Sequence, residues 1–349
     1  MKKKYHVYGV GNALVDRDAK VNDALLQALN IEKNVMTLID EETHHRLTKA
    51  LADSFCHSSC GGSAANTLIA LSQFGGLGFY SCKVADDEAG HLFLRELKAL
   101  DLECNLSLKT LSPGITGQCT VLVTDDAQRT MNTHLGISET LDNAVLNFDA
   151  IADSEYVYLE GYLITSPTAK KALLAARRHA QASNTKVALT LSDPNMVRYF
   201  KNDLLTIIDG QVDLLFCNED EALLFSGADH LEIAINLLQP LAKHLVVTCG
   251  SRGAILAIDG DMITISTKAT QAVDTVGAGD MFAGAYLWAI THGYAPQLAV
   301  ELANKAATEV VCQYGARLSL EKVLAIKEEF VAANYSLIRP VHIQSKVMP

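Results

Sequence analysis

The chain has 349 residues, 49% of them hydrophobic, so it can bury a full core in one large domain. Its net charge of −11 argues against a nucleic acid or an anionic membrane as partner, since either would require a basic face. The sequence shows no apolar run of about 18 residues, no signal-peptide core and no Cys-x-x-Cys pair among its 8 cysteines, so we expect a cytoplasmic protein with reduced thiols.

The first predicted strand, residues 6–10, ends in a tight turn that is followed by Asn12 and Asp16. Gly9-Val10-Gly11 suggests a dinucleotide-binding turn, but the third glycine of that fingerprint would fall at Leu14, so we exclude it. Ligands of open α/β sheets bind at the carboxyl ends of the strands. Asn12 and Asp16 are therefore candidate ligand residues, with Asp16 accepting from two neighbouring hydroxyls. The alternative is a turn asparagine and a surface aspartate.

Two later segments are predicted to form a small β lid. Apolar spacing favours short helices over residues 23–30 and 41–52, on either side of an extended segment over residues 35–39. Further along, alternation of polar and apolar residues favours a β-hairpin over residues 116–136. No linker-like composition divides the chain. We therefore expect one domain over residues 1–349, with the lid made of insertions within roughly 13–60 and 114–136. Arg129 begins the returning strand of the hairpin, where a lone arginine is usually solvated.

Residues 60–67 are predicted to open a helix through Gly61 and Gly62. Two successive glycines allow a ligand to approach the backbone closely. Asn66 lies one turn into this helix, where asparagine is disfavoured unless its side chain has a partner. That partner is either a neighbouring carbonyl or a bound ligand.

The second half of the chain alternates apolar strands with helices, and each strand ends in a polar cluster. This pattern predicts a parallel sheet that is buried on both faces and carries its site along one edge. Asn218 and Glu221 follow one strand at the start of a helix. Thr248, Gly250 and Gly253 follow the next, although a Gly-x-x-Gly turn alone is weak evidence.

The most specific pattern is the loop Asp274-Thr275-Val276-Gly277-Ala278-Gly279-Asp280, which runs into an apolar helix. Its glycines let successive N–H groups turn toward one point, and the positive end of the helix favours an anion there. The amides of Gly277, Ala278 and Gly279 are the predicted anion site. Asp280 is either a helix-capping residue or, beside a phosphate, a base that takes the proton of an attacking hydroxyl.

This loop, followed by Gly284-Ala285, resembles the C-terminal signature of the ribokinase-like (PfkB-type) carbohydrate and nucleoside kinases. The likeness runs from Gly11-Asn12 to Gly315-Ala316. It implies a three-layer α/β/α sandwich with a mostly parallel central sheet and a small β lid. It also implies an ATP-dependent phosphotransferase with an alcohol acceptor. Within the family the chain is most similar to the adenosine kinases.

The resemblance also implies a role for each matched residue. Asp280 is the catalytic base, the amides of Gly277, Ala278 and Gly279 form the anion hole, and Arg129 reaches the transferring phosphate from the lid. Glu221 organises Mg²⁺, which we expect to be held largely through water. The acceptor residues are Asn12, Asp16, Gly61, Gly62 and Asn66; the ATP residues are Asn218, Thr248, Gly250, Gly253 and Asn304; and a monovalent cation such as K⁺ is implied near Asp274, Gly315-Ala316 and Ser319.

The acceptor is expected to be a nucleoside phosphorylated on its primary 5′ hydroxyl, with adenosine first. The alternative is a sugar such as ribose or fructose, because Asp193-Pro194-Asn195 is closer to the sugar kinases. Tyr162 and Phe200 are candidates to hold a base. A non-catalytic nucleotide or sugar sensor is a third possibility, against which the intact Asp280 argues. A lid sheet could cover one site or pair with another copy, so both a monomer and a homodimer are consistent with the sequence.

Overall fold

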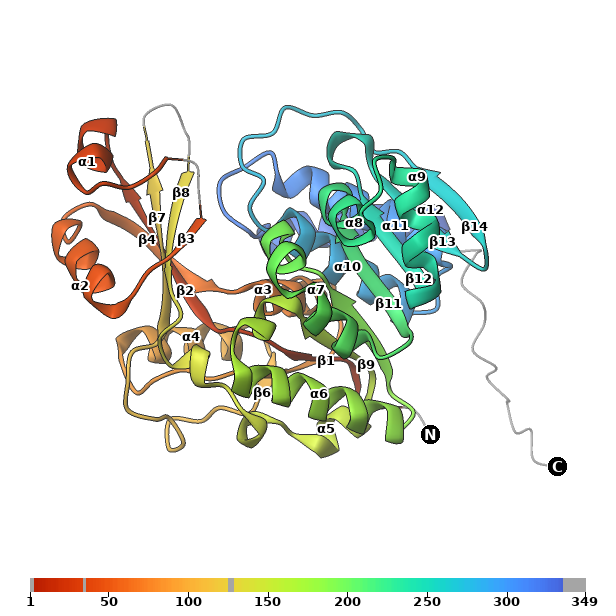
Figure 1. Ribbon diagram of the computed structural model, residues 1–349, viewed down its shortest axis with the longest axis horizontal. Helices are drawn as coiled ribbons and strands as arrows, with labels where there is room; N and C mark the ends of the chain where they lie inside the picture. Colours follow the sequence, from red (N-terminus) through yellow and green to blue (C-terminus); the bar gives the residue numbers. More distant parts are fainter. Residues whose placement is uncertain (1–2, 34–35, 125–128, 335–349) are drawn as a thin grey trace.

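The computed structural model describes residues 3–33, 36–124 and 129–334, and one large sheet organises them. Its strands are β1 (Tyr5–Val10), β5 (Gly78–Ser81), β6 (Glu103–Cys104), β9 (Ser154–Glu160), β10 (Lys186–Thr190), β11 (Val212–Asn218), β12 (Ala242–Thr248), β13 (Ala254–Ile258) and β14 (Asp261–Ile265). They are ordered β14-β13-β12-β11-β10-β9-β1-β5-β6 (Figure 1). Neighbouring strands are parallel from β6 to β12, and the β12–β13 and β13–β14 pairs are antiparallel.

Alternate residues of these strands point to opposite faces of the sheet, and each face packs against its own layer of helices. Tyr156 and Tyr158 of β9 belong to one apolar core, while Val157 and Leu159 belong to the other. The first layer holds α3 (Ser63–Gln73), α4 (Glu88–Ala99), α10 (Ala278–Thr291), α11 (Pro296–Val310) and α12 (Leu320–Asn334); the second holds α5 (Phe148–Ala152), α6 (Pro167–Ala182), α7 (Pro194–Ile208), α8 (Glu219–Ser226) and α9 (Leu231–Leu238). The predicted three-layer α/β/α fold with a mostly parallel sheet is therefore confirmed.

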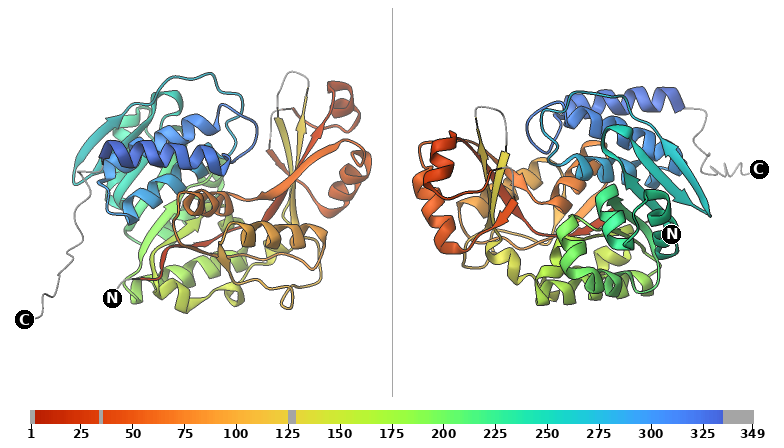
Figure 2. Two further views of the ribbon diagram at one scale, coloured as in Figure 1. Left: turned by 180° about the vertical axis from the view of Figure 1, so that it is seen from behind. Right: turned by 45° about the horizontal axis from the view of Figure 1, so that its top comes forward.

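A second, smaller sheet projects from the first as a separate lobe (Figures 1 and 2). It comprises β2 (Leu14–Lys20), β3 (Met36–Leu38), β4 (Phe55–Gly61), β7 (Gly117–Val123) and β8 (Arg129–His134), in the order β3-β8-β7-β2-β4. Two helices, α1 (Asp23–Ala28) and α2 (Glu41–Ala50), cover it through a small apolar cluster of their own. These elements fall in the two ranges predicted to form the lid, and the predicted turn at residues 125–128 lies outside the described residues.

Local sequence signals set the starts of the helices beside the site. Ser166 caps α6 ahead of Pro167, as predicted, and Asn218 with Glu221 forms a capping box on α8. In α10 the capping position is Gly277. Within the described ranges, none of the helices is both long and apolar enough to span a membrane.

Candidate active site

The carboxyl ends of the central strands open into a cavity of about 450 Å³ that the lid borders on its other side. Strands β9, β11 and β12 contribute their last residues to it, namely Glu160, Asn218 and Thr248. A second cavity of about 230 Å³ adjoins the first. Both are lined by Thr248, Gly279 and Phe282, so the two cavities meet at the start of α10.

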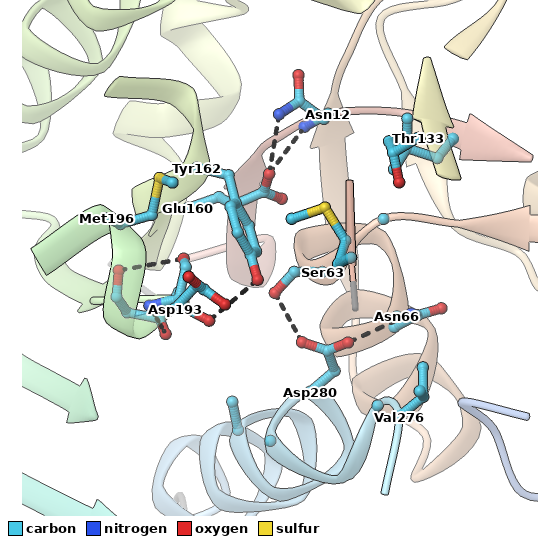
Figure 3. Close-up of a pocket in the computed structure, with 18 of the residues that line it drawn as sticks. Asn12, Ser63, Asn66, Thr133, Glu160, Tyr162, Asp193, Met196, Val276 and Asp280 are labelled. Atoms are coloured by element: carbon cyan, nitrogen blue, oxygen red, sulfur yellow. Dashed lines mark hydrogen bonds between the residues drawn. The ribbon is translucent and has the colours of Figure 1, made fainter. Parts of the chain in front are cut away.

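The position of Asp280 follows from a close crossing of α10 and α3. A Cβ atom on Gly284 would lie 2.5 Å from the carbonyl oxygen of Thr67, so only glycine permits this approach. Asp280 lies one turn before Gly284 on the same face of α10. Its carboxylate consequently reaches the first turn of α3, where it accepts hydrogen bonds from Ser63 Oγ (2.6 Å) and Asn66 Nδ2 (3.3 Å) (Figure 3).

Asp280 is not the capping residue of its helix. Gly277 takes that position, with φ at 75°, and the Asp280 carboxylate is held by side chains of another helix. Burial raises the pKa of Asp280 to about 6, while the hydrogen bonds from Ser63 and Asn66 act in the opposite direction. The carboxylate lines the larger cavity and is mostly ionised above neutral pH, so it can accept a proton there.

The three amides predicted to bind an anion differ in availability. A Cβ atom on Gly277 would come within 2.6 Å of the Ala316 Cα atom, so the neighbouring turn fixes this glycine. At Gly279 a Cβ atom would meet nothing within 4 Å, and the residue borders both cavities. The N–H of Ala278, in contrast, donates to Thr275 O (3.3 Å). Gly279 is therefore the open position of this loop, whereas Gly277 is enclosed by the neighbouring turn.

The residues predicted to bind the acceptor lie together on one side of the larger cavity. Asn12, Asp16, Gly62 and Asn66 line it. Gly61 does not, but a Cβ atom there would lie 2.6 Å from Asp16 Cγ, so Gly61 makes room for this carboxylate. Burial raises the pKa of Asp16 to about 7.

Glu160 is a buried site residue that the sequence analysis did not identify. Its Oε1 accepts from the N–H and the Nδ2 of Asn12 (3.3 Å each), and its Oε2 accepts from the N–H of Ala64 (2.9 Å). Glu160 therefore joins β9 to the turn after β1, as Figure 3 shows for Asn12, and through Ala64 to α3. Burial raises its pKa to about 7. The one sequence signal was its position as a carboxylate at the end of an apolar strand.

The residues predicted to bind ATP divide between the two cavities. Gly250, Gly253 and Asn304 line the smaller cavity, and Thr248 lines both. Asn304 donates from Nδ2 to Ile265 O (2.9 Å), which anchors it to β14. Asn218 lines the larger cavity instead.

Glu221 is positioned by Asn218 and contributes to no cluster of metal-ligating side chains. Its carboxylate accepts from the N–H (3.0 Å) and Nδ2 (2.8 Å) of Asn218, and burial raises its pKa to about 7. The described residues contain no group of three or more His, Cys, Asp or Glu side chains that could hold a metal ion. Asn218 and Glu221 both line the larger cavity, where they would hold a Mg²⁺ ion through its waters.

Arg129 contacts the loop ahead of α10 and lines neither cavity. Its Nη1 lies 3.1 Å from Asp274 Oδ2. The Asp274 carboxylate also accepts from the N–H of Val276 (3.0 Å) and of Gly315 (2.9 Å). With three donors, one of them a guanidinium, this carboxylate does not fit the K⁺ ion implied by the resemblance. The hydroxyl of Ser319 accepts from the N–H of Lys322 (3.4 Å).

The lid gives the larger cavity an apolar end. Met36, Leu38, Met131 and Leu135 line it from β3, β8 and the residue after β8. Of the aromatic candidates, Tyr162 lines the cavity and donates to Ser192 O (3.2 Å), whereas Phe200 packs against the core instead. Among the described residues, the charged ones that line this cavity are all acidic: Asp16, Glu160, Asp193, Glu221 and Asp280.

Comparison with known proteins agrees with this architecture. The chain matches the family model described as pfkB family carbohydrate kinase over residues 32–323. Two solved structures are each 32% identical to it with a TM-score of 0.85: an adenosine kinase from Sinorhizobium meliloti, covering 93% of this chain and 99% of that one, and a probable sugar kinase from Rhizobium etli CFN 42, covering 94% and 99%. The adenosine kinase of Schizosaccharomyces pombe is 23% identical over 341 residues, which are 91% of this chain and 97% of that protein.

Proposed function

Because this chain belongs to the pfkB family of carbohydrate kinases and is an ATP-dependent kinase, we propose that it phosphorylates the 5′ hydroxyl of a nucleoside, most specifically adenosine. The combination of a polar and an apolar end in one acceptor cavity carries this proposal. A nucleoside has the same two ends, since a ribose is joined to a flat base.

The polar end suits the ribose. No hydrogen bond from a described residue reaches the Asp16 carboxylate, which is therefore free to accept from two adjacent hydroxyls. Asn66 borders the same space, and its amide already points toward Asp280. A ribose bound here by its secondary hydroxyls has its primary hydroxyl directed toward Asp280.

The apolar end suits the base. Leu38 is 53% exposed, so its side chain has little cover from the described residues, and Met36, Met131 and Leu135 border the same space. Burial of apolar surface here stabilises a complex by roughly 25 cal/mol per Å². The faces of a purine provide such surface, whereas a free sugar carries hydroxyls around its ring.

The acidic lining of the larger cavity further limits the charge that the acceptor can carry. Among the described residues that line this cavity there is no lysine or arginine to pair with a phosphate group of the acceptor. A phosphorylated sugar would therefore place its anion beside carboxylates, at an electrostatic cost. We infer a neutral acceptor.

The proposed reaction is an in-line phosphoryl transfer. ATP lies along the smaller cavity, with its base toward Asn304 and its γ-phosphate at Gly279, where the two cavities meet. The acceptor oxygen attacks the γ-phosphorus as its proton passes to Asp280, and the bond to the β-phosphate oxygen breaks. The amides of Gly277 and Gly279 stabilise the negative charge of the transition state. Mg²⁺, held through water by Glu221 and Asn218, would neutralise charge on the phosphates.

An acceptor panel tests the proposal. ADP release from Mg·ATP is measured with adenosine, inosine, cytidine, ribose, fructose and fructose 6-phosphate. We expect adenosine to give the highest kcat/KM and fructose 6-phosphate to give none above background. A higher kcat/KM for ribose or fructose would instead identify a sugar kinase, the alternative favoured by Asp193 in the cavity and by the similarity to the Rhizobium etli protein. Adenosine binding without ADP release would identify a sensor.

A further inference from the structure

Arg317 lies directly behind the acceptor site, in the turn between α11 and α12. Its side chain is 19% exposed, and its guanidinium donates to three separate elements. Nε donates to Asn66 Oδ1 on α3 (3.0 Å), Nη1 to Glu96 Oε2 on α4 (3.2 Å), and Nη2 to Cys60 Sγ at the end of β4 (3.1 Å). A planar guanidinium with three anchored groups has little freedom to move.

The contact with Asn66 determines which end of the amide faces Asp280. The oxygen and the NH₂ group of an asparagine are similar in size, so the surroundings decide their arrangement. A guanidinium can only donate, so the oxygen must face Arg317. The NH₂ group is thereby directed to Asp280 Oδ2, at 3.3 Å. Without Arg317 the amide could turn its oxygen toward the carboxylate and lose this hydrogen bond.

The contacts with Glu96 and Cys60 hold the segment that leads into the site. Glu96 Oε2 accepts from Arg317 and also from the N–H of Cys60 (2.9 Å). Cys60 immediately precedes Gly61, which packs under Asp16. Through its hydrogen bonds to Glu96, Cys60 and Asn66, the guanidinium therefore holds the segment before Gly61-Gly62 and the first turn of α3 in place.

Arg317 also places a positive charge near both acceptor-site carboxylates. Burial raises the pKa of Asp280 and of Asp16, and the charge of Arg317 lowers both. Other charged or titratable groups among the described residues also interact with these two carboxylates or with Arg317: Asp18, Cys60, Glu96, Cys119, Arg129, Tyr158, Glu160 and Tyr162. Among the cations that the structure describes, Arg317 is connected to Asp280 through a hydrogen-bonding partner that both share, Asn66.

We propose that Arg317 is a positioning residue for phosphoryl transfer, which fixes the Asn66 amide against Asp280 and holds a permanent positive charge behind the acceptor site. This inference rests on the roles proposed for Asp280 and Asn66. Arg317 lines neither cavity and reaches the acceptor site only through Asn66, which does line the larger one.

The test compares the pH dependence of kcat/KM for the wild type, Arg317→Met and Arg317→Lys with the best acceptor and Mg·ATP. Methionine keeps much of the side-chain length but removes the charge and the donors. We expect kcat/KM of Arg317→Met to be about tenfold below that of the wild type near pH 6 and only about twofold below it near pH 9. The reason is that the acidic limb of the pH profile moves to higher pH. Arg317→Lys should keep the limb of the wild type with a lower plateau. Arg177→Met is the matched control, since Arg177 also donates to groups of the protein, Ile208 O and Asp209, but lines neither cavity.

A titration of Asp280 by carboxyl NMR complements the kinetics and requires no turnover. It therefore reports on Arg317 even if the acceptor panel fails. The pKa of Asp280 should be higher in Arg317→Met than in the wild type and unchanged in Arg177→Met. An unchanged pKa and an unmoved limb in Arg317→Met would overturn the proposal, as would an equal shift in Arg177→Met. Arg317→Met is judged unfolded if it loses ATP binding. In that case a displaced acidic limb in the pH profile of Arg317→Lys would overturn the proposal.

Discussion

Asp280 and Asn66 lie far apart in the sequence but share one hydrogen bond at the acceptor site. Replacing Asp280 with asparagine keeps the size of the side chain and its contact with Ser63 but removes the proton acceptor. We therefore expect kcat to fall by roughly 10²–10⁴-fold. ATP binding should change little, because we propose that ATP binds mainly in the smaller cavity, which Asp280 does not line. Single-turnover kinetics measure the first quantity and calorimetry the second. Wild-type turnover in this variant would show that another group accepts the proton.

A second prediction for single residues concerns Arg129, because its guanidinium is the positive charge paired with the Asp274 carboxylate. We expect the melting temperature and kcat of the wild type to be the same in KCl and in choline chloride. Arg129→Ala should lower kcat by about tenfold or more, since the loop carrying Gly277 and Gly279 loses a contact, and should gain a specific response to K⁺. Arg17→Ala is the control, as Arg17 stacks on Phe55 of the same lid. Activation of the wild type by K⁺ would contradict this account.

Which site residues a sequence can reveal depends on how local their partners are. Asp280 and its glycines form one contiguous motif, so the loop was recognisable. Glu160 and Arg317 act on residues 96 and 251 positions away, at Ala64 and Asn66, and no local pattern marks such pairs. For Arg129 the sequence suggested the transferring phosphate, whereas the structure places its guanidinium on Asp274.

At the scale of elements, the strands and helices were predictable because each carries its own periodicity and caps. The apolar strand around Tyr156–Leu159 and the Ser166-Pro167 start of α6 are local signals. The crossing of α10 over α3 was not predictable, since it depends on Gly284 meeting Thr67 across more than 200 residues of chain. That crossing, and not either helix alone, places Asp280 in the site.

The lid carries a pH-sensitive pair of elements, α2 and β8. The rings of His44 and His134 stack with their centroids 5.0 Å apart, and neither nitrogen of the His134 ring has a hydrogen-bonding partner among the described residues. Burial lowers the pKa of both, that of His44 to about 4. Since the unfolded value is about 6.5, the folded lid favours the neutral form, and its stability falls as the pH decreases from about 6.5 toward 4.

This linkage is tested with His44→Phe, which keeps a stacked ring but cannot be protonated. We expect the wild-type melting temperature to fall between pH 7 and pH 5 by an amount on the order of 2–4 °C more than that of the variant. Differential scanning calorimetry measures both. Arg17, His45, Asp40, Glu41 and Glu139 also act on this pair, so the two proteins are compared at the same ionic strength. Equal pH dependence of both proteins would exclude the histidine pair as the cause.

At the scale of the whole molecule, we expect ATP to contact the part of the chain outside the lid and the acceptor to contact the lid as well. The described residues that line the smaller cavity all lie outside the lid, among them Gly250, Asn304 and Thr308, whereas residues of the lid and of the rest of the chain both line the larger cavity. Protection from amide exchange requires that a ligand suppress local opening of the segments it contacts. ATP alone should therefore protect residues 248–253 and 267–279, and adenosine should also protect β3 and β8 of the lid.

Ribose provides the matched control for this experiment, because it lacks a base and, in the proposed binding mode, would fill the polar end of the larger cavity alone. It should slow exchange near Asp16 and in the first turn of α3, but leave β3 and β8 as they are in the free protein, since in this mode Met36, Leu38 and Met131 contact the base. Hydrogen exchange read by mass spectrometry resolves these segments. If ribose and adenosine protected the lid strands equally, the apolar end would not be a base site, and the acceptor would be a sugar.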